Sequence, residues 1–366
     1  MSKKTICIFT SIEGHFTLAK ALEQLLEKTY DVHIYFERDN SFTLYLPIYQ
    51  LFPGAFKYPF QISQKEKVVN VIHQYAKSKY QKKIAAFCKK YQPDLCINTF
   101  WMYNRCLEEV CGASNIPFIN VLTDPRTVHP AVIAEKATAN VLFDEGQKKF
   151  CQKFFPNANY VMCCWLVKEE YELPYDQAEV RKNLGLKKDA LTILLTSGSE
   201  GTNIITKILP AMMTSDTPLQ IIVACGSNKT LLRAIKTLST LVKATNSHHT
   251  ILAIPFTHQL YFYMQASDLV MGKAGPNTIF ESVATQTPFF AITHIAGQED
   301  GNLDILREYH LGYVEENTFK AAKILKKIMQ RPAELQQFEE PLKKVAEYNC
   351  GTKAKILKFV DSLLTS

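Results

Sequence analysis

The sequence lacks any long hydrophobic run, and this absence argues against an integral membrane protein. Its apolar stretches all fall short of the roughly 20 residues that a spanning helix needs, so we expect no transmembrane segment. The opening residues, MSKKTICIFTSIEG, carry only a short apolar run before Glu13. They predict a first β-strand and not a signal peptide, which indicates a cytoplasmic protein.

Clustered cysteine motifs are also missing, although the chain has ten cysteines. None forms a C-x-x-C pair, and none stands at zinc-ligand spacing from a histidine. In a chain without a secretory signal, this scatter predicts mostly buried, reduced thiols. The adjacent pair Cys163 and Cys164 is expected to pack in a core. We expect no metal and no cofactor.

The common nucleotide-binding loops are absent as well. Neither G-x-x-x-x-G-K-[ST] nor G-x-G-x-x-G occurs, which counts against an ATPase and against a dinucleotide enzyme. The net charge of +7 and the isoelectric point near 8.7 favour anionic partners, whether phosphates, acidic lipid headgroups or nucleic acid. Aromatic and basic residues do not interleave on a recognisable RNA module, so we expect no nucleic acid partner.

The sequence does contain an α/β pattern long enough for two domains. At 366 residues, 47% of them hydrophobic, it exceeds one ordinary core. Short apolar runs alternate with helical patterns, which predicts parallel sheets built from βαβ units. The expected strands are 5–10, 31–36, 94–99, 117–124, 140–144 and 159–167, then 191–202, 219–226, 249–256, 267–273 and 288–293.

This pattern predicts two doubly wound, Rossmann-like α/β domains that face a cleft, with the ligand at the carboxyl ends of the strands. The predicted division is an N-terminal domain at 1–165, a linker at 166–190, a C-terminal domain at 191–348 and a terminal helix at 349–366. The two halves share this layout without a detectable sequence repeat.

Three of the predicted strands run into turns of small residues that are followed by a helix start. Such turns let backbone N–H groups and the positive helix terminus approach an anion. They contain Gly14 and His15; Gly198, Ser199, Gly201 and Thr202; and Lys273, Ala274, Gly275, Pro276, Asn277 and Thr278. One such turn is weak evidence, because every α/β protein needs tight turns. Two of them on neighbouring strands of one domain predict an anion-binding site.

Polar residues beyond the third turn are ambiguous from spacing alone. Glu281 either accepts two hydroxyl groups, as an acidic residue does for a nucleotide ribose, or is a solvated helix residue. Gln298, Glu299 and Asn302 stand in the predicted loop HIAGQEDGN, at 294–302. Their side chains suit a polyhydroxylated ligand, but an ordinary polar loop has the same composition.

One stretch makes the sequence similar to a known family. It reads GKAGPNTIFESVATQTPFFAI, followed by GQEDGN, and resembles the donor-binding half of the family 28 glycosyltransferases. The likeness is to the monogalactosyldiacylglycerol synthase and processive diacylglycerol glucosyltransferase branch and, more distantly, to the peptidoglycan N-acetylglucosaminyltransferase. That branch carries K-x-G-P-x-T-I-x-E, which stands here at 273–281, and G-Q-E-x-x-N, at 297–302. In the N-terminal half, LTDPRTVHP (122–130) resembles its T-D-x-x-x-x-H-P, and IEGHFTLAKAL resembles its glycine-rich loop.

The resemblance implies a glycosyltransferase B fold. It also implies an inverting, metal-independent transfer of a hexose from a UDP-sugar to a lipid, first of all diacylglycerol. The hexose would be glucose, galactose or N-acetylglucosamine.

The same resemblance implies roles for individual residues. The diphosphate would be held by Ser199, Gly201 and the turn of Ala274, Gly275, Pro276, Asn277 and Thr278, with Thr202 and Lys273 in the same donor site. Phe256 would lie beside the uracil, Glu281 would bind the ribose, and Gln298, Glu299 and Asn302 would hold the sugar. His15 and Asp124, which is expected to end a strand, would face the acceptor, and either would take its proton.

Two departures from the family pattern concern the acceptor side. Glu13 stands where the family has glycine, and the tryptophan usual after the H-P pair is absent beyond His129 and Pro130. They permit a non-catalytic subunit whose N-terminal half has drifted, and a second alternative is independent of them. That subunit would bind a nucleotide sugar without turning it over. The second alternative is an isomerase similar to the UDP-N-acetylglucosamine 2-epimerase, against which the G-P-x-T-I-x-E run counts.

A candidate membrane-facing region follows the glycine-rich loop motif in the chain. Residues 41–62 are rich in Phe, Tyr, Leu and Pro, and a basic helix is predicted after them. Its lysines are Lys65, Lys67, Lys77, Lys79, Lys82, Lys83, Lys89 and Lys90. An aromatic stretch beside a basic helix would dock on an anionic bilayer and admit a lipid; the alternative is a solvated lysine face. The family likeness favours peripheral association with the inner face of the membrane. Oligomeric state is not predicted.

Overall fold

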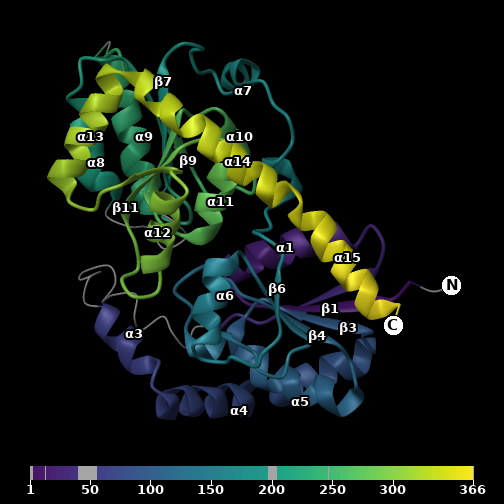
Figure 1. The fold of residues 1–366 in the computed structure, drawn as a ribbon. Helices are drawn as coiled ribbons and strands as arrows, with labels where there is room; N and C mark the ends of the chain where they lie inside the picture. The colour runs from purple at the N-terminus through teal and green to yellow at the C-terminus, as the bar shows by residue number, and fades with distance from the viewer. Residues whose placement is uncertain (1–2, 13, 40–55, 197–203, 246, 366) are drawn as a thin grey trace. The chain divides into compact units, whose positions relative to one another are not determined.

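The chain folds into two compact units, which a computed structural model describes for residues 3–12, 14–39, 56–196, 204–245 and 247–365. The first unit consists of Met1–Glu169, Ile295–Gly301 and Tyr348–Ser366, and the second of Glu170–His294 and Asn302–Glu347. Each unit contains one parallel six-stranded sheet with helices packed around it (Figure 1).

The first sheet has the strand order β2-β1-β3-β4-β5-β6, and every pairing in it is parallel. Its strands are β1 Thr5–Thr10, β2 Asp31–Phe36, β3 Leu95–Asn98, β4 Phe118–Val121, β5 Ala139–Leu142 and β6 Tyr160–Met162. Strands such as β1 are buried almost throughout, which explains their continuous apolar sequence. The strand order reverses between β1 and β3, so their carboxyl ends form the position where ligands bind in open α/β sheets.

Helices surround this sheet. They are α1 Gly14–Leu26, α3 Lys57–Ser63, α4 Glu66–Tyr91, α5 Asn104–Ser114, α6 Glu145–Gln152 and α15 Thr352–Leu364. Along α4 the buried residues recur every three or four positions, from Val69 to Cys88, so one helix face enters the core beside α5 and the lysines lie on the others. The helix ends at Gln92, which adopts a left-handed conformation.

The second sheet has the strand order β12-β11-β10-β7-β8-β9, the doubly wound order of a dinucleotide-binding domain. Its strands are β7 Leu191–Thr196, β8 Leu219–Ala224, β9 Thr250–Ile254, β10 Leu269–Lys273, β11 Phe289–Thr293 and β12 Gly312–Val314. The helices are α7 Gln177–Asn183, α8 Ile204–Met213, α9 Lys229–Ala244, α10 Leu260–Gln265, α11 Pro276–Ala284, α12 Asp300–Glu308, α13 Thr318–Gln330 and α14 Glu339–Cys350. Here the order reverses between β7 and β10.

The structure corrects three details of the sequence prediction. Asp124 does not end a strand, because β4 ends at Val121 and Pro125 supplies no N–H for a sheet. Asn302 is not in a loop but in α12, whose first turn contains the acidic Asp300 that favours a helix start. The short edge strand β12 was not predicted, because three half-buried residues carry no clear alternation.

The fold bears on two further expectations, one about the cysteines and one about membrane-spanning helices. All ten cysteines are free and nine are buried, with Cys350 exposed, so the expectation of mostly buried, reduced thiols is confirmed. Over the described residues, no helix combines the length and the apolar character needed to cross a bilayer.

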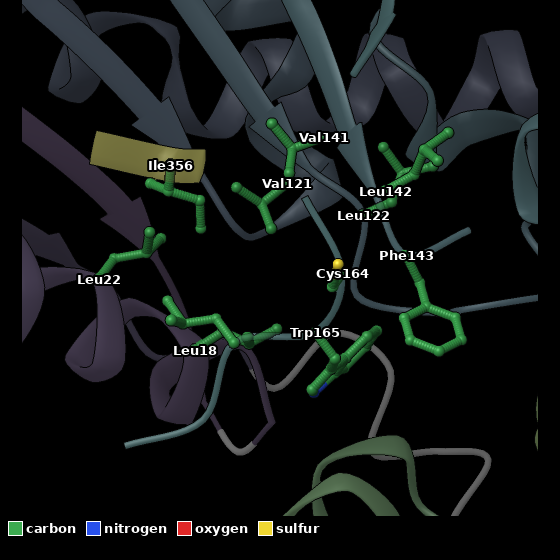
Figure 2. Close-up of a pocket in the computed structure, with 11 residues that line it drawn as sticks. Leu18, Leu22, Val121, Leu122, Val141, Leu142, Phe143, Cys164, Trp165 and Ile356 are labelled. Atoms are coloured by element: carbon green, nitrogen blue, oxygen red, sulfur yellow. The ribbon is translucent and has the colours of Figure 1, made fainter. Parts of the chain in front are cut away.

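A small apolar cavity lies inside the first unit, with a volume of about 20 Å³ (Figure 2). Its walls include Leu18, Leu22, Val121, Val141, Trp165 and Ile356. A cavity of this size holds about one water-sized sphere, so it offers no space for an acyl chain.

Candidate active site

The turn after β10 begins the candidate donor site, at the carboxyl edge of the second sheet. Gly275 caps α11 in an extended conformation, and Pro276 occupies the first helical position. The Asn302 side chain donates a hydrogen bond from Nδ2 to the carbonyl oxygen of Ala274 over 2.8 Å. The N–H of Ala274 donates to the carbonyl oxygen of Thr293 over 2.9 Å, so the turn is fixed on both sides.

Close packing of β10 against β7 explains the glycine that precedes this turn. A Cβ atom on Gly272 would lie 2.2 Å from Oγ1 and 2.6 Å from the carbonyl oxygen of Thr196 on β7. Gly272 therefore brings the two strands together at the reversal point of the sheet. The predicted residues Ser199, Gly201 and Thr202 follow β7 in the chain, but they lie outside the described residues.

The start of α11 has the features of an anion-binding site, which are backbone N–H groups at a helix terminus and a nearby lysine. Pro276, Asn277 and Thr278 form its half-buried first turn, and Lys273 ends the strand before it. The first N–H groups of a helix have no partner within the helix and carry a positive partial charge. This arrangement suits a phosphate group at the end of the sheet.

Glu281 is buried, which excludes the solvated reading of this residue. Its side chain is on α11 and the residue is 8% exposed. The carboxylate lies beside the hydroxyl of Tyr171, whose pKa is raised by burial and by this negative charge. Tyr175 donates a hydrogen bond to the carbonyl oxygen of Thr285, at the end of the same helix, over 2.6 Å. Sequence reasoning missed Tyr171, because nothing in the predicted linker pointed to a partner 110 residues away on α11.

Phe256 follows β9 at the same edge of the second sheet. Its residue is 64% exposed, and its backbone N–H donates to the carbonyl oxygen of Gly226 over 2.9 Å. The ring packs edge-on against His258 with centroids 5.0 Å apart. An exposed aromatic face at this edge is available for stacking on a base.

The predicted sugar-binding residues are divided between the two units. Gln298 and Glu299 are in the 295–301 segment of the first unit, whereas Asn302 is in the second. Glu299 is buried, and its Oε2 accepts a hydrogen bond from the N–H of Ile295 over 2.7 Å. Gln298 is half-buried.

His15 lies at the reversal point of the first sheet, in the first turn of α1. Its Nδ1 is 2.6 Å from the carbonyl oxygen of Thr99, which follows β3. A carbonyl oxygen only accepts, so Nδ1 carries the proton and Nε2 keeps its lone pair. Burial lowers the pKa of His15 to about 4, although the hydrogen bond to Thr99 opposes the shift. At neutral pH the ring is therefore an uncharged base.

Asp124 and His129 occupy the segment after β4. Asp124 is half-buried, and its carbonyl oxygen accepts a hydrogen bond from Nε2 of Gln147 over 2.7 Å. His129 accepts the N–H of Ala131 at Nδ1 over 3.1 Å, and its Nε2 is 3.0 Å from Oγ of Ser63. His129 thus joins this segment to α3, while Asp124 follows the strand beside β3.

Buried asparagines hold the segment at 130–134 in place. Asn120 donates to the carbonyl oxygen of Val132 over 2.8 Å and to Oδ1 of Asn140 over 2.8 Å. Asn104 also donates to the Val132 carbonyl, over 2.9 Å. The sequence signal for Asn120 and Asn140 is an asparagine inside an apolar strand, a feature that Asn98 of β3 shares. Strands disfavour asparagine unless its amide is bonded.

Comparison with known proteins gives matches in both halves of the chain. The family model of the glycosyltransferase family 28 C-terminal domain matches residues 192–302, and that of monogalactosyldiacylglycerol synthase matches residues 13–159. The probable monogalactosyldiacylglycerol synthase 3 of Oryza sativa subsp. japonica is 28% identical over 268 residues, which are 67% of this chain and 50% of that protein. The chain thus spans about half the length of this plant relative.

A bacterial relative is covered more completely. The processive diacylglycerol beta-glucosyltransferase of Staphylococcus carnosus is 23% identical over 312 residues, which are 85% of this chain and 75% of that protein.

Solved structures share the fold over nearly the whole chain. Acinetobacter baumannii MurG superposes with a TM-score of 0.61 at 15% identity, covering 97% of this chain and 98% of that one. Anabaena HepE in complex with UDP and glucose gives 0.61 at 12% identity, covering 99% and 100%. The predicted glycosyltransferase B fold is therefore confirmed. Together with the two family matches, the shared fold makes the chain similar to the family 28 glycosyltransferases, with monogalactosyldiacylglycerol synthase and diacylglycerol glucosyltransferase among its relatives.

Proposed function

We propose that this chain catalyses an inverting, metal-independent transfer of a hexose from a UDP-sugar to a lipid acceptor, with diacylglycerol as the first candidate. The observation that carries the proposal is the β10–α11 turn, braced by Asn302 at the reversal point of the second sheet, with buried Glu281 behind it. The names of the relatives, which include a diacylglycerol glucosyltransferase, support a lipid acceptor.

The donor is bound along the carboxyl edge of the second sheet. Backbone N–H groups at the start of α11, together with Ser199, Gly201 and Thr202, hold the diphosphate. Glu281 accepts the ribose hydroxyls, and the exposed ring of Phe256 stacks on the uracil. Gln298, Glu299 and Asn302 bind the sugar.

His15 acts as the base of the transfer. Its unprotonated Nε2 removes the proton of the acceptor hydroxyl as that oxygen forms its bond to the anomeric carbon. The bond from this carbon to the diphosphate breaks on the opposite side, the electron pair leaves with UDP, and the configuration inverts. The helix terminus at Pro276 stabilises the charge that develops on the leaving group.

A surface on α3 and α4 supports membrane association of the first unit. Tyr58 and Val71 are 69% and 68% exposed, and Ile62 and Tyr75 are also exposed. We call these four residues, with Lys67 and Lys82 of α4, the α3–α4 surface. Exposed apolar side chains with flanking lysines bind anionic lipid surfaces. We propose that this surface docks on the cytoplasmic face of a membrane.

Ion pairs reduce the contribution of three other lysines of α4. Lys77, Lys79 and Lys83 lie 2.6, 3.1 and 2.5 Å from carboxylate oxygens of Glu109, Asp39 and Glu37. Their charge is therefore balanced within the protein, so Lys67 and Lys82 contribute more to the attraction of lipid headgroups. Residues 41–55 of the predicted aromatic stretch at 41–62 lie outside the described residues.

Release of UDP tests this proposal. The chain is incubated with UDP-glucose, UDP-galactose or UDP-N-acetylglucosamine, with and without anionic vesicles that contain diacylglycerol. Release of UDP from one of these donors only when diacylglycerol is present is expected. Sugar isomerisation without acceptor would instead indicate an epimerase, and UDP binding without turnover would indicate a non-catalytic subunit. Glu281→Ala should weaken UDP binding and lower turnover.

A further inference from the structure

The 295–301 segment is bound to the first unit by contacts at both of its glycines. The N–H of Gly301 donates a hydrogen bond to Oγ1 of Thr127 over 2.7 Å. A Cβ atom at position 301 would lie 2.2 Å from Cβ of Arg126 and 2.7 Å from Oγ1 of Thr127. Only glycine allows this approach, so the second glycine of the GQEDGN motif makes room for Arg126 and Thr127.

The first glycine of the GQEDGN motif, Gly297, is also required by its surroundings. Gly297 has a φ of +89°, in the left-handed region that favours glycine. A Cβ atom there would also lie 3.0 Å from the ring of Phe60, on α3. Gln298 and Glu299 are thus enclosed between two glycines that each touch another part of the first unit.

Hydrogen bonds inside the segment connect its residues to one another. Oε2 of Glu299 accepts the N–H of Ile295, and Oδ1 of Asp300 accepts the N–H of Gly297, both over 2.7 Å. A change at the Gly301 end is therefore transmitted to the two polar side chains. The Thr127 end is itself anchored, because neighbouring Arg126 forms an ion pair with Asp144 at 2.6 Å.

We propose that Thr127 is a positioning residue for the hexose of the nucleotide sugar, because it holds the segment that carries Gln298 and Glu299. This inference rests on the proposed function and goes beyond it by separating sugar binding from nucleotide binding. The residues proposed for the diphosphate and ribose, which are Ser199, Gly201, Thr202 and those at 273–281, are outside the 295–301 segment. Loss of the Thr127 hydroxyl therefore affects the sugar contacts and leaves the nucleotide contacts intact.

The test compares the dissociation constants of UDP and of nucleotide sugars for the full chain. Calorimetric titrations use UDP, UDP-glucose, UDP-galactose and UDP-N-acetylglucosamine with Thr127→Val and Thr127→Ser. For the nucleotide sugar that the wild type binds most tightly, Thr127→Val should raise Kd roughly tenfold, the effect of one lost hydrogen bond. Its Kd for UDP should stay unchanged, and Thr127→Ser, which keeps the hydroxyl, should restore most of the affinity.

Matched control variants distinguish a positioning role of Thr127 from a general loss of structure. Thr138 is also half-buried and accepts a backbone N–H, from Phe118 over 2.9 Å, so Thr138→Val is the control for a lost hydroxyl. Gly301→Ala should reproduce the selective loss of sugar affinity, whereas Gly112→Ala, where a Cβ meets no atom within 4 Å, should not.

Three outcomes would overturn the inference. Unchanged nucleotide-sugar affinity in folded Thr127→Val would remove the role of the hydroxyl, and an equal loss for UDP would indicate a general structural effect. A wild-type chain that binds none of the four nucleotides would overturn the proposed function together with this inference.

Discussion

The proposed chemistry depends on a histidine whose proton is positioned by one carbonyl group. Because Nδ1 of His15 donates to Thr99, Nε2 is the basic atom. His15→Asn should therefore lower kcat about 10²- to 10⁴-fold, the usual contribution of a general base. The Kd for UDP should not change, since the nucleotide residues are on the second sheet. Initial rates and UDP titrations measure both values. An unchanged kcat would transfer the role of base to Asp124.

The same histidine makes the stability of the chain depend on pH. In the folded chain burial lowers the pKa of His15 to about 4, whereas its ordinary value is 6.5. Between these values the unfolded chain binds a proton that the folded chain does not. The free energy of unfolding should therefore fall as the pH decreases from about 6.5 to about 4. Burial also lowers the pKa of His129 to about 4, which adds to the trend.

Urea denaturation at several pH values measures this dependence. His15→Asn should show a shallower decline of the free energy of unfolding than the wild type. His310→Asn is the control, because that residue is exposed and has a φ of 52°, which asparagine tolerates. Equal slopes for His15→Asn and the wild type would contradict the burial argument.

The helix α4 has two separate roles, one on each side. Its inner side packs in the core of the first unit, and its outer side contributes Lys67, Val71, Tyr75 and Lys82 to the α3–α4 surface. A lysine near an anionic membrane contributes about 1 kcal/mol to binding. Lys67→Glu and Lys82→Glu should therefore each weaken binding to anionic vesicles by at least about fivefold.

Sedimentation with vesicles measures this effect. Lys236→Glu and Lys243→Glu, exposed on α9, are the matched controls and should bind like the wild type. Equal losses from α4 and α9 would indicate a response to net charge alone, and the α3–α4 surface would lose its assignment.

At the scale of the whole chain, the helix α15 belongs to the first unit and not to the second. Val360 and Ile356 of α15 are buried in the first unit, Ile356 with 7% exposure. Tyr30, between α1 and β2, donates a hydrogen bond to Asp361 on the same helix. Ile356→Ala should lower the free energy of unfolding of the first unit by about 2–5 kcal/mol, with little change in the second.

Hydrogen exchange resolved by peptide distinguishes the two units. Faster exchange of the first sheet, with unchanged exchange in β7 and β8, is expected for Ile356→Ala. Lys358→Ala, two positions along on an exposed site, is the control. Uniformly faster exchange in both sheets would show that the two units unfold together.

Much of the fold was predictable because the determinants of strands and turns are local. The inner parallel strands are buried on both faces and appear as apolar runs, so β1 and β11 lie close to the predicted ranges. Pro276 at the first position of α11 follows from its fixed φ and missing N–H. The family motifs are likewise contiguous and indicated the same sheet edge.

Tertiary structure alone decided which groups became partners. Thr127 and Gly301 are 174 positions apart, so nothing near either residue indicates their hydrogen bond. Glu281 was ambiguous until the fold buried it beside Tyr171. Periodicity, turn geometry and contiguous motifs arise between near neighbours, so the sequence by itself determined the sheets and the donor edge. Burial and long-range hydrogen bonds exist only after the chain has closed its loops, so the state of Glu281 and the attachment of the 295–301 segment were decided by the tertiary structure.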